Sequence, residues 1–346
     1  MSDGNSQLPA DVTILNLTLA EAATQQELRR QAAVIDGVAV SFQQTPQLDG
    51  RVTLNVHFAP LPAAGGAAPT PAVPPIAAPT PVLSVPGKGG HALSAEHWQT
   101  TLGALGNPDE ALLWALIKQE SENMTGFLPD RRPIILYERH VFARNSNNRF
   151  NQSHPDISGP QYKPGEYGSL DNQYRRLVEA MALDHAAALM AASWGLGQTL
   201  GEGAVEIGYA SVDALVAQMQ VSEDLHLDAM VAEIGKKNAV QVFKNRTNGL
   251  KDFARLYNGA GRVDGYASEL TAKFDEFRTK GLPDVPVRTA QMYLTYQNEK
   301  PGPIDGVMGN TTRTALLSFQ SKQGLPGSGV ADIATLERLQ ALLFSA

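Results

Sequence analysis

The chain of 346 residues contains no cysteine. This absence excludes disulfide bonds, zinc sites with thiolate ligands and cysteine nucleophiles. Charged residues are sparse, at 18% of the chain, and the formal net charge is −7. A mildly acidic chain without a basic block is poorly suited to nucleic acid, because neutralisation of phosphates dominates that affinity. We therefore expect no nucleic-acid partner.

Long apolar runs are also missing. The longest stretch without Asp, Glu, Lys or Arg, residues 52–87, is rich in proline and cannot form a spanning helix. The first residues show no positive segment followed by an apolar run, so no secretory signal peptide is predicted. We expect a chain that is made in the cytoplasm and does not insert into a membrane.

Motifs for metals and phosphates are lacking too. The seven histidines form no His-Glu-x-x-His pair. His91 and His97 flank a predicted helix start and leave a zinc peptidase as an alternative. The segment 195–197, Gly-Leu-Gly, lacks the third glycine and the preceding strand of a dinucleotide-binding loop. We predict no metal site and no cofactor.

Composition divides the chain into four regions. Residues 1–59 predict a small α+β domain that serves for docking, and residues 60–90 an extended linker rich in proline and alanine. Residues 91–283 show the spacing of amphipathic helices, and residues 284–346 form a separate small module. The fold class is therefore mainly α. In the first region a βαββ order is predicted, with strands at 12–17, 38–42 and 52–58 and a helix over 19–34.

Glu120 is the strongest catalytic candidate. Its helix is predicted to begin at residues 107–110, where Asn-Pro-Asp-Glu combines a cap, a proline and acidic residues. Glu120 follows Leu116 by four residues and Ile117 by three, so it projects from the apolar face. Burial and the helix dipole would both raise its pKa. A carboxylic acid still protonated near neutral pH can protonate a glycosidic oxygen, whereas the alternative is a solvent-facing glutamate at a frayed helix end.

Other side chains are candidates for the rest of the site. Glu138 follows the apolar run 133–137 and is the candidate second carboxylate, although a buried ion pair with Arg139 or another arginine explains it equally well. Ser193 and Gln198 flank glycines after an alanine-rich helix, where a sugar chain could approach the backbone. The alternative there is an ordinary helix cap.

A second groove segment follows the next predicted amphipathic helix. Tyr257 closes its apolar stripe, and Asn258 or Gly259 is expected in the left-handed cap position. The alternative is a core tyrosine followed by a cap. Tyr257 and Asn258 complete the set of candidate substrate-binding residues.

Four ordered motifs together resemble the N-acetylmuramidase domain of phage endolysins, within the lysozyme-like superfamily. They are Glu-Ser at 120–121, Ile-Leu-Tyr-Glu-Arg-His-Val-Phe at 135–142, Ser-Trp-Gly-Leu-Gly-Gln at 193–198 and Phe-Ala-Arg-Leu-Tyr-Asn-Gly at 253–259. The resemblance implies a lysozyme-like helical domain that cuts the β-1,4 bond after N-acetylmuramic acid in peptidoglycan. It places the catalytic acid at Glu120 and the glutamate of the Glu-Arg-His segment at Glu138.

The last 60 or so residues resemble the common peptidoglycan-binding module. The match includes Gly-Pro-Ile-Asp-Gly-Val-Met-Gly-Asn-Thr-Thr at 302–312, and Thr311 or Thr312 is expected to cap a helix. The resemblance implies a non-catalytic domain of three helices that holds wall stem peptide.

These resemblances imply a peptidoglycan hydrolase that acts in the periplasm or cell wall after delivery. A lytic transglycosylase and a non-catalytic wall-anchoring protein are the alternatives. Because no signal peptide is predicted, delivery as a phage lysin or a secreted antibacterial effector is expected, with residues 11–59 docking to a virion or secretion partner. An effector would also require an immunity protein in the producing cell.

Overall fold

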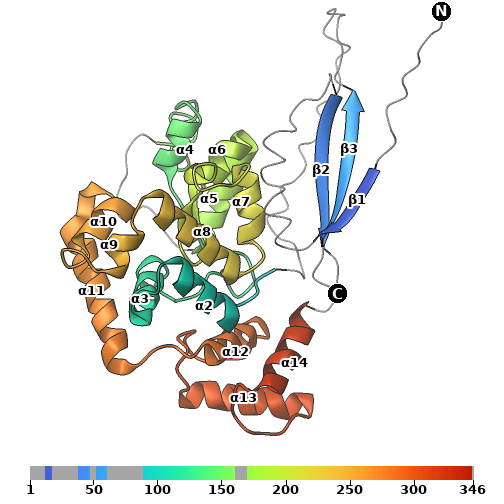
Figure 1. Cartoon of the computed structure of the whole chain (residues 1–346), viewed down its shortest axis with the longest axis vertical. Coiled ribbons are helices and arrows are strands. Elements are labelled where there is room, and N and C mark those ends of the chain that lie inside the picture. The colour runs from blue at the N-terminus through green and yellow to red at the C-terminus, as the bar shows by residue number, and fades with distance from the viewer. Residues whose placement is uncertain (1–11, 18–37, 47–51, 61–88, 160–169, 345–346) are drawn as a thin grey trace, which may run out of the picture. The chain divides into compact units, whose positions relative to one another are not determined.

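The computed structural model describes residues 12–17, 38–46, 52–60, 89–159 and 170–344, and the chain divides into two compact units, residues 1–76 and 77–346. In the first unit, strands β1 (Val12–Leu17), β2 (Val38–Pro46) and β3 (Val52–Pro60) form an antiparallel sheet in the order β1-β3-β2. These strands lie where alternating residues predict them (Figure 1). The helix predicted over 19–34 lies outside the described residues, as does most of the linker.

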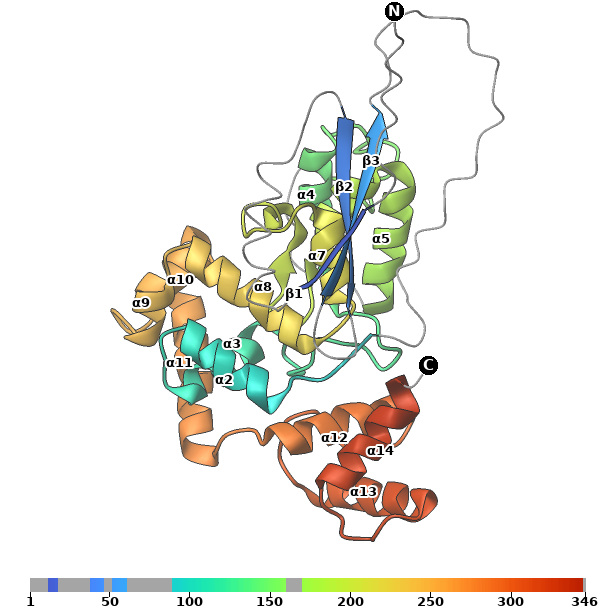
Figure 2. The same cartoon turned by 45° about the vertical axis from the view of Figure 1, so that its right-hand side comes forward.

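The second unit is mainly helical, as predicted (Figures 1 and 2). Its helices up to residue 280 are α2 (Ala95–Ala104), α3 (Glu110–Glu120), α4 (Arg139–Asn145), α5 (Leu170–Leu183), α6 (His185–Met190), α7 (Val212–Met219), α8 (Glu223–Lys236), α9 (Val240–Lys244), α10 (Lys251–Tyr257) and α11 (Val263–Lys280). Short 3₁₀ turns lie at Gly201–Gly203 and Ala260–Arg262. The described part of the chain contains no helix long and apolar enough to cross a membrane.

Two hydrophobic cores support this helical body. The first surrounds α3, whose residues from Ala111 to Ile117 are all buried, and includes the inner faces of α10 and α11. The second surrounds α5, α6 and α7. Helix α8 joins them, since Leu227 and Met230 lie in the first core and Ala229 in the second. Helix α8 is therefore apolar on two sides and packs against both hydrophobic cores.

Helix boundaries follow their caps. Ser211 and Ser222 cap α7 and α8 by accepting hydrogen bonds from backbone amides in the first turn. Helix α3 begins two residues later than predicted, because Asp109 rather than Asn107 caps it, accepting from the amide of Ala111 at 3.1 Å. Asn107 instead adopts a positive φ of 56° in the preceding turn.

The segment after α6 differs from its prediction. The alanine-rich helix ends at Met190, and Ser193 lies on strand β5 (Ala192–Trp194) rather than at a helix end. Strand β5 pairs with β4 (Ile135–Tyr137) and with β6 (Thr199–Leu200), so that Ser193 lies opposite Leu136. The buried pairing of Trp194 with Ile135 stabilises the strand, an interaction between distant segments that local propensity does not contain.

The C-terminal residues form the expected small helical module, with α12 (Val285–Tyr296), α13 (Asn310–Gln323) and α14 (Ile333–Phe344) around their own core. The expected threonine cap was wrong, because Gly309 precedes α13 and no side chain caps it. Thr312 is buried instead, donating to the carbonyl of Pro301 at 2.8 Å and accepting from Gln291 at 3.2 Å. Burial of this hydroxyl requires such partners.

Candidate active site

Glu120 is the last residue of α3, where the buried part of the helix meets the surface. It is half-buried, and its carboxylate accepts a hydrogen bond from the hydroxyl of Tyr266 on α11. Burial raises the pKa of Glu120 to about 7, and the charge of nearby Glu233 adds to the shift. The hydrogen bond from Tyr266 opposes it, as do the charges of Lys237 and Lys273. The group can therefore hold a proton near neutral pH.

The carboxylate of Glu233 on α8 lies near Glu120 and acts on it through its charge. The ammonium group of Lys237 donates to Glu233 at 2.6 Å and to the carbonyl of Tyr257 at 2.6 Å. The same ammonium lies 4.8 Å from the centre of the Tyr257 ring. Sequence reasoning missed Glu233, because a Glu-Lys pair four residues apart is typical of an exposed helix face. Its effect on Glu120 arises only when α3 and α8 are packed together.

Tyr257 closes the apolar stripe of α10, as predicted, and its ring stacks on Phe253 at a centroid distance of 5.0 Å. Its pKa is raised well above the ordinary value by burial and by the charges of Glu233 and Glu120. Asn258 is exposed and ends α10 with a right-handed backbone, while Gly259 takes the positive φ of 89°. The structure thus brings Tyr257 close to Glu120, whereas the side chain of Asn258 is exposed.

Ser193 and Gln198 lie on the two sides of a glycine turn between β5 and β6. Ser193 is buried on β5, and Gln198 has a positive φ of 48° with its amide donating to the carbonyl of Gly195 at 2.8 Å. That bond holds the turn, and Gln198 remains half-buried. The turn is also held from beneath, since the amide of Leu196 donates to Nδ1 of His226 at 3.0 Å.

His226 in the first turn of α8 is fully buried and supports two loops at once. Its Nε2 lies 2.6 Å from the carbonyl of Met219, so Nε2 carries the proton and Nδ1 accepts. Burial lowers its pKa, which keeps the ring neutral. A Cβ at Gly126 would lie 2.3 Å from Nδ1, and one at Gly195 would lie 2.6 Å from it. Both glycines are therefore required for close packing on this ring.

Glu138 precedes α4 and belongs to another group of charges. Its carboxylate lies 3.6 Å from Nε2 of His140, while Arg144 donates to Glu202 at 2.7 Å. Burial raises the pKa of Glu138, and the charge of Arg144 partly offsets this. Glu138 is half-buried, and its neighbours are His140, whose own pKa is lowered by burial, and the cation Arg144.

The histidines predicted as alternative zinc ligands have other surroundings. His91 stacks on Phe344 at 3.9 Å, and His97 lies 3.0 Å from a carboxylate oxygen of Asp228. Among the described residues no group of three or more His, Asp or Glu side chains is arranged to hold a metal ion.

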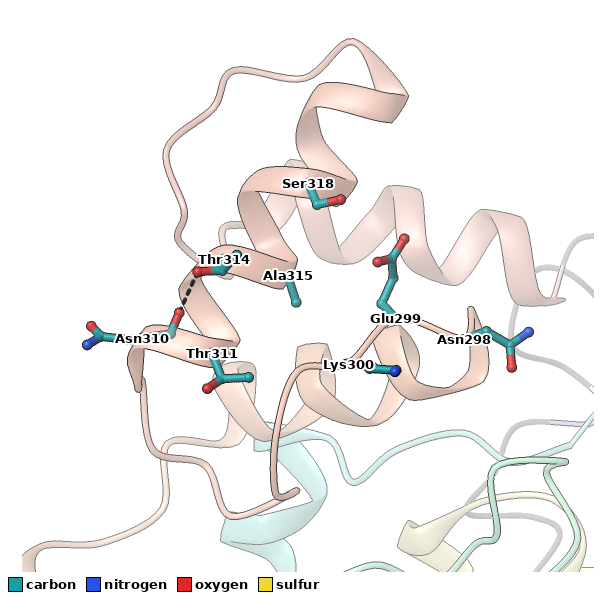
Figure 3. A pocket seen from close by; sticks show the side chains of 8 residues that line it. All are labelled: Asn298, Glu299, Lys300, Asn310, Thr311, Thr314, Ala315 and Ser318. Atoms are coloured by element: carbon teal, nitrogen blue, oxygen red, sulfur yellow. Dashed lines mark hydrogen bonds between the residues drawn. The ribbon is translucent and has the colours of Figure 1, made fainter.

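The C-terminal module carries an open cavity of about 630 Å³ between α13 and the turn after α12 (Figure 3). Figure 3 shows polar side chains around it from both elements. Its lining consists of Asn298, Glu299, Lys300, Asn310, Thr311, Thr314, Ala315 and Ser318. Amide, hydroxyl and charged groups of this kind suit a peptide with its own amides and charged ends.

Comparison with known families agrees with these two parts. Residues 109–278 match the family model described as N-acetylmuramidase, and residues 284–339 match that of a peptidoglycan binding domain. The chain is 32% identical to the Burkholderia AP3 phage endolysin of known crystal structure, covering 55% of this chain and 72% of that one, with a TM-score of 0.48. No curated protein matches the chain.

The helical domain and the wall-binding module, by their family matches, define the class as a peptidoglycan hydrolase. Within this class, residues 109–278 belong to the N-acetylmuramidase family, and a peptidoglycan-binding domain follows at residues 284–339. Both resemblances predicted from sequence motifs are thereby confirmed.

Proposed function

We propose that the protein hydrolyses the β-1,4 bond between N-acetylmuramic acid and N-acetylglucosamine, with Glu120 as the general acid. The observation that carries this proposal is the half-buried carboxyl at the end of α3, hydrogen-bonded to Tyr266, with a pKa of about 7. At that pKa a substantial fraction of the carboxyl groups is protonated at neutral pH, and the carboxyl group can itself donate the proton to the glycosidic oxygen.

In the proposed mechanism, Glu120 donates its proton to the glycosidic oxygen as the bond to the anomeric carbon breaks. The sugar gains oxocarbenium character, water attacks the anomeric carbon, and a proton is lost to a base. Tyr266 holds the carboxyl of Glu120 in one orientation through its hydroxyl. Ser193, Gln198, Tyr257 and Asn258 are proposed to contact the sugar chain.

The bond cleaved can be tested by mass spectrometry of muropeptides released from purified walls. A muramidase releases products with a reducing N-acetylmuramic acid end. Anhydro ends would identify a lytic transglycosylase instead, because the 6-hydroxyl then replaces water. Wall binding without release of any fragment would support the non-catalytic anchoring alternative.

The rate should fall on the alkaline side as Glu120 loses its proton. Because burial raises the pKa of Glu120 to about 7, the reactive protonated form dominates below that pH and decreases about tenfold per pH unit well above it. Hydrolysis of soluble glycan strands between pH 5 and pH 9 measures this limb. Wall binding measured over the same range is the control, and a constant rate up to pH 9 would contradict the assignment.

The second carboxylate is proposed to be Glu138, with Glu233 as the structural alternative. If Glu138 stabilises the developing positive charge, Glu138→Gln should lower kcat by about 10²-fold or more at every pH. Glu233→Gln should instead move the alkaline limb to lower pH, because it removes a charge that raises the pKa of Glu120. Comparing the two pH profiles separates these roles. If only Glu138→Gln moves the alkaline limb of the pH profile, the roles of Glu138 and Glu233 are exchanged.

Delivery is proposed to depend on residues 11–59, which precede a spacer rich in proline. The sheet β1-β3-β2 offers a docking surface for a virion or secretion component, and an effector of this kind would be paired with an immunity protein. A chain lacking residues 1–90 should lyse purified walls within about twofold of the full chain. Loss of that activity would show that the N-terminal region has another role.

A further inference from the structure

A buried ion pair joins the C-terminal module to the catalytic domain. Arg288 on α12 donates to the two carboxylate oxygens of Glu223 on α8, at 2.6 and 2.7 Å. Both side chains are completely buried. Two parallel bonds of this kind define the orientation of both partners. The module is therefore held against the body at one defined place, not merely tied to it by chain connectivity.

The same pair holds the loop that follows Glu120. Nε of Arg288 donates to the carbonyl of Met124 at 3.0 Å, and the carboxylate of Glu223 accepts from the amide of Gly126 at 2.8 Å. Both backbone groups belong to the 121–134 loop, which begins directly after the acid and leads to β4. Arg288 and Glu223 thus satisfy a donor and an acceptor that the loop cannot pair within itself.

Packing and backbone geometry also connect this loop to the module. Phe127 lies in the hydrophobic core formed by α12, α13 and α14, and is 2% exposed. Met124 has a positive φ of 53°, a conformation that costs energy for a residue with a side chain. The bonds from Arg288 to the Met124 carbonyl help to maintain it.

The glycine turn between β5 and β6 is attached to the same turn of α8. His226 lies three residues after Glu223 and accepts from Leu196, while Phe127 stacks on its ring at 4.7 Å. Since Gly126 and Gly195 both pack against His226, a displacement of the 121–134 loop would disturb the glycine turn as well. One turn of α8 therefore sets the spacing between the 121–134 loop and the glycine turn.

We propose that Arg288 is a positioning residue for the reaction at Glu120, so that the peptidoglycan-binding module completes the catalytic site in addition to binding the wall. Arg288 orients the 121–134 loop, and through it the end of α3 and the glycine turn. The inference rests on the proposed function of Glu120 as the acid.

The test uses Arg288→Lys in the full chain. Lysine keeps the positive charge but has no planar fork to reach both Glu223 and the Met124 carbonyl. On soluble glycan strands, below the melting temperature of every variant, kcat should fall about tenfold with KM changed less than threefold, and the alkaline limb should move. The matched control is Tyr293→Phe, which removes a bond from the Ala92 amide to the module (3.1 Å) without involving the loop. It should lower the melting temperature and leave kcat within twofold.

A folded Arg288→Lys variant with wild-type kcat and pH profile would overturn the proposal. If the variant does not fold, amide hydrogen exchange of the wild-type chain decides. The amide of Gly126 should be protected as strongly as the amides of α12, and exchange about 100-fold faster would show that the loop moves independently of the module. Glu120→Gln is assayed in parallel. If it retains wild-type activity, the assignment of Glu120 as the acid is wrong. The exchange result does not depend on that assignment and tests the positioning role by itself.

Discussion

Replacing Glu120 by glutamine is expected to lower hydrolysis of peptidoglycan by about 10³-fold or more and to stabilise the protein at alkaline pH. The loss of rate follows because glutamine has no proton to donate to the glycosidic oxygen, and general acid catalysis contributes about 10²–10⁴-fold. Binding to walls should be unchanged, since the module is untouched. Equal clearing of walls by both proteins would move the acid elsewhere.

The gain in stability follows from linkage between folding and protonation. Burial raises the pKa of Glu120 from 4.5 to about 7, so the folded state binds the proton more tightly than the unfolded state. Stability linked to this group is complete below about pH 4.5 and is lost as pH rises through about 7. Since Glu120 is half-buried, we expect Glu120→Gln to gain only about 1–3 kcal/mol at pH 8 and little at pH 4.5.

Urea denaturation at the two pH values measures this difference. Glu122→Gln is the matched control, because Glu122 is an exposed glutamate two residues further along the chain. It should change the free energy of unfolding equally at both pH values. A Glu120→Gln variant whose stability relative to wild type is the same at pH 4.5 and pH 8 would show that the carboxyl is solvated like an ordinary surface group.

Replacing Arg288 by methionine is expected to lower the free energy of unfolding by about 3–5 kcal/mol. The change leaves the carboxylate of Glu223 without its guanidinium partner in a place that water does not reach. Although burial alone would raise the pKa of Glu223, Arg288 and the amides of Gly126 and Leu93 lower it below its ordinary value. The folded state of the wild type therefore depends on a charge that the variant cannot compensate.

A double variant separates the cost of an unpaired charge from that of the lost hydrogen bonds. Glu223→Leu with Arg288→Met removes both charges and should recover part of the loss. Recovery stays incomplete, because the amides of Leu93 and Gly126 and the carbonyl of Met124 lose their partners.

The exposed pair of Arg175 and Glu179 provides a surface control for this prediction. Arg175→Met should cost less than about 1 kcal/mol, since water already solvates both partners. Chemical denaturation of the wild type, of Arg288→Met, of Arg175→Met and of the double variant measures these differences in the free energy of unfolding. A loss at Arg288 no greater than at Arg175 would mean that the buried pair contributes little.

Local spacing was sufficient for several features. The apolar residues at 116 and 117 placed Glu120 on a buried helix face, and the raised pKa agrees with that position. The serines at 211 and 222 cap their helices because a side-chain oxygen satisfies amides only two or three residues away. Such interactions involve neighbours in the chain and are visible as patterns.

Features that depend on distant segments were not predicted. Ser193 lies on a strand because Trp194 pairs with Ile135, some sixty residues earlier in the chain. Val178 follows the buried Leu177 on α5 but is itself 50% exposed, because the neighbouring elements cover only part of this helix. In the sequence, Glu233 has the pattern of a surface residue, and only the packing of α8 and α3 places it close enough to affect the pKa of Glu120.

The order of its motifs determined the family of this protein, its mainly helical class, its wall-binding module and the identity of the candidate acid. Tertiary structure alone decided that three segments meet at the start of α8. There Glu223 binds Arg288 of the module and the amide of Gly126 in the loop after Glu120, and His226 binds the glycine turn. The physical reason is that an isolated charged residue in a sequence carries no sign of burial. Its partner, and therefore its role, is defined only when segments that are 65 residues apart, as Glu223 and Arg288 are, pack without water between them.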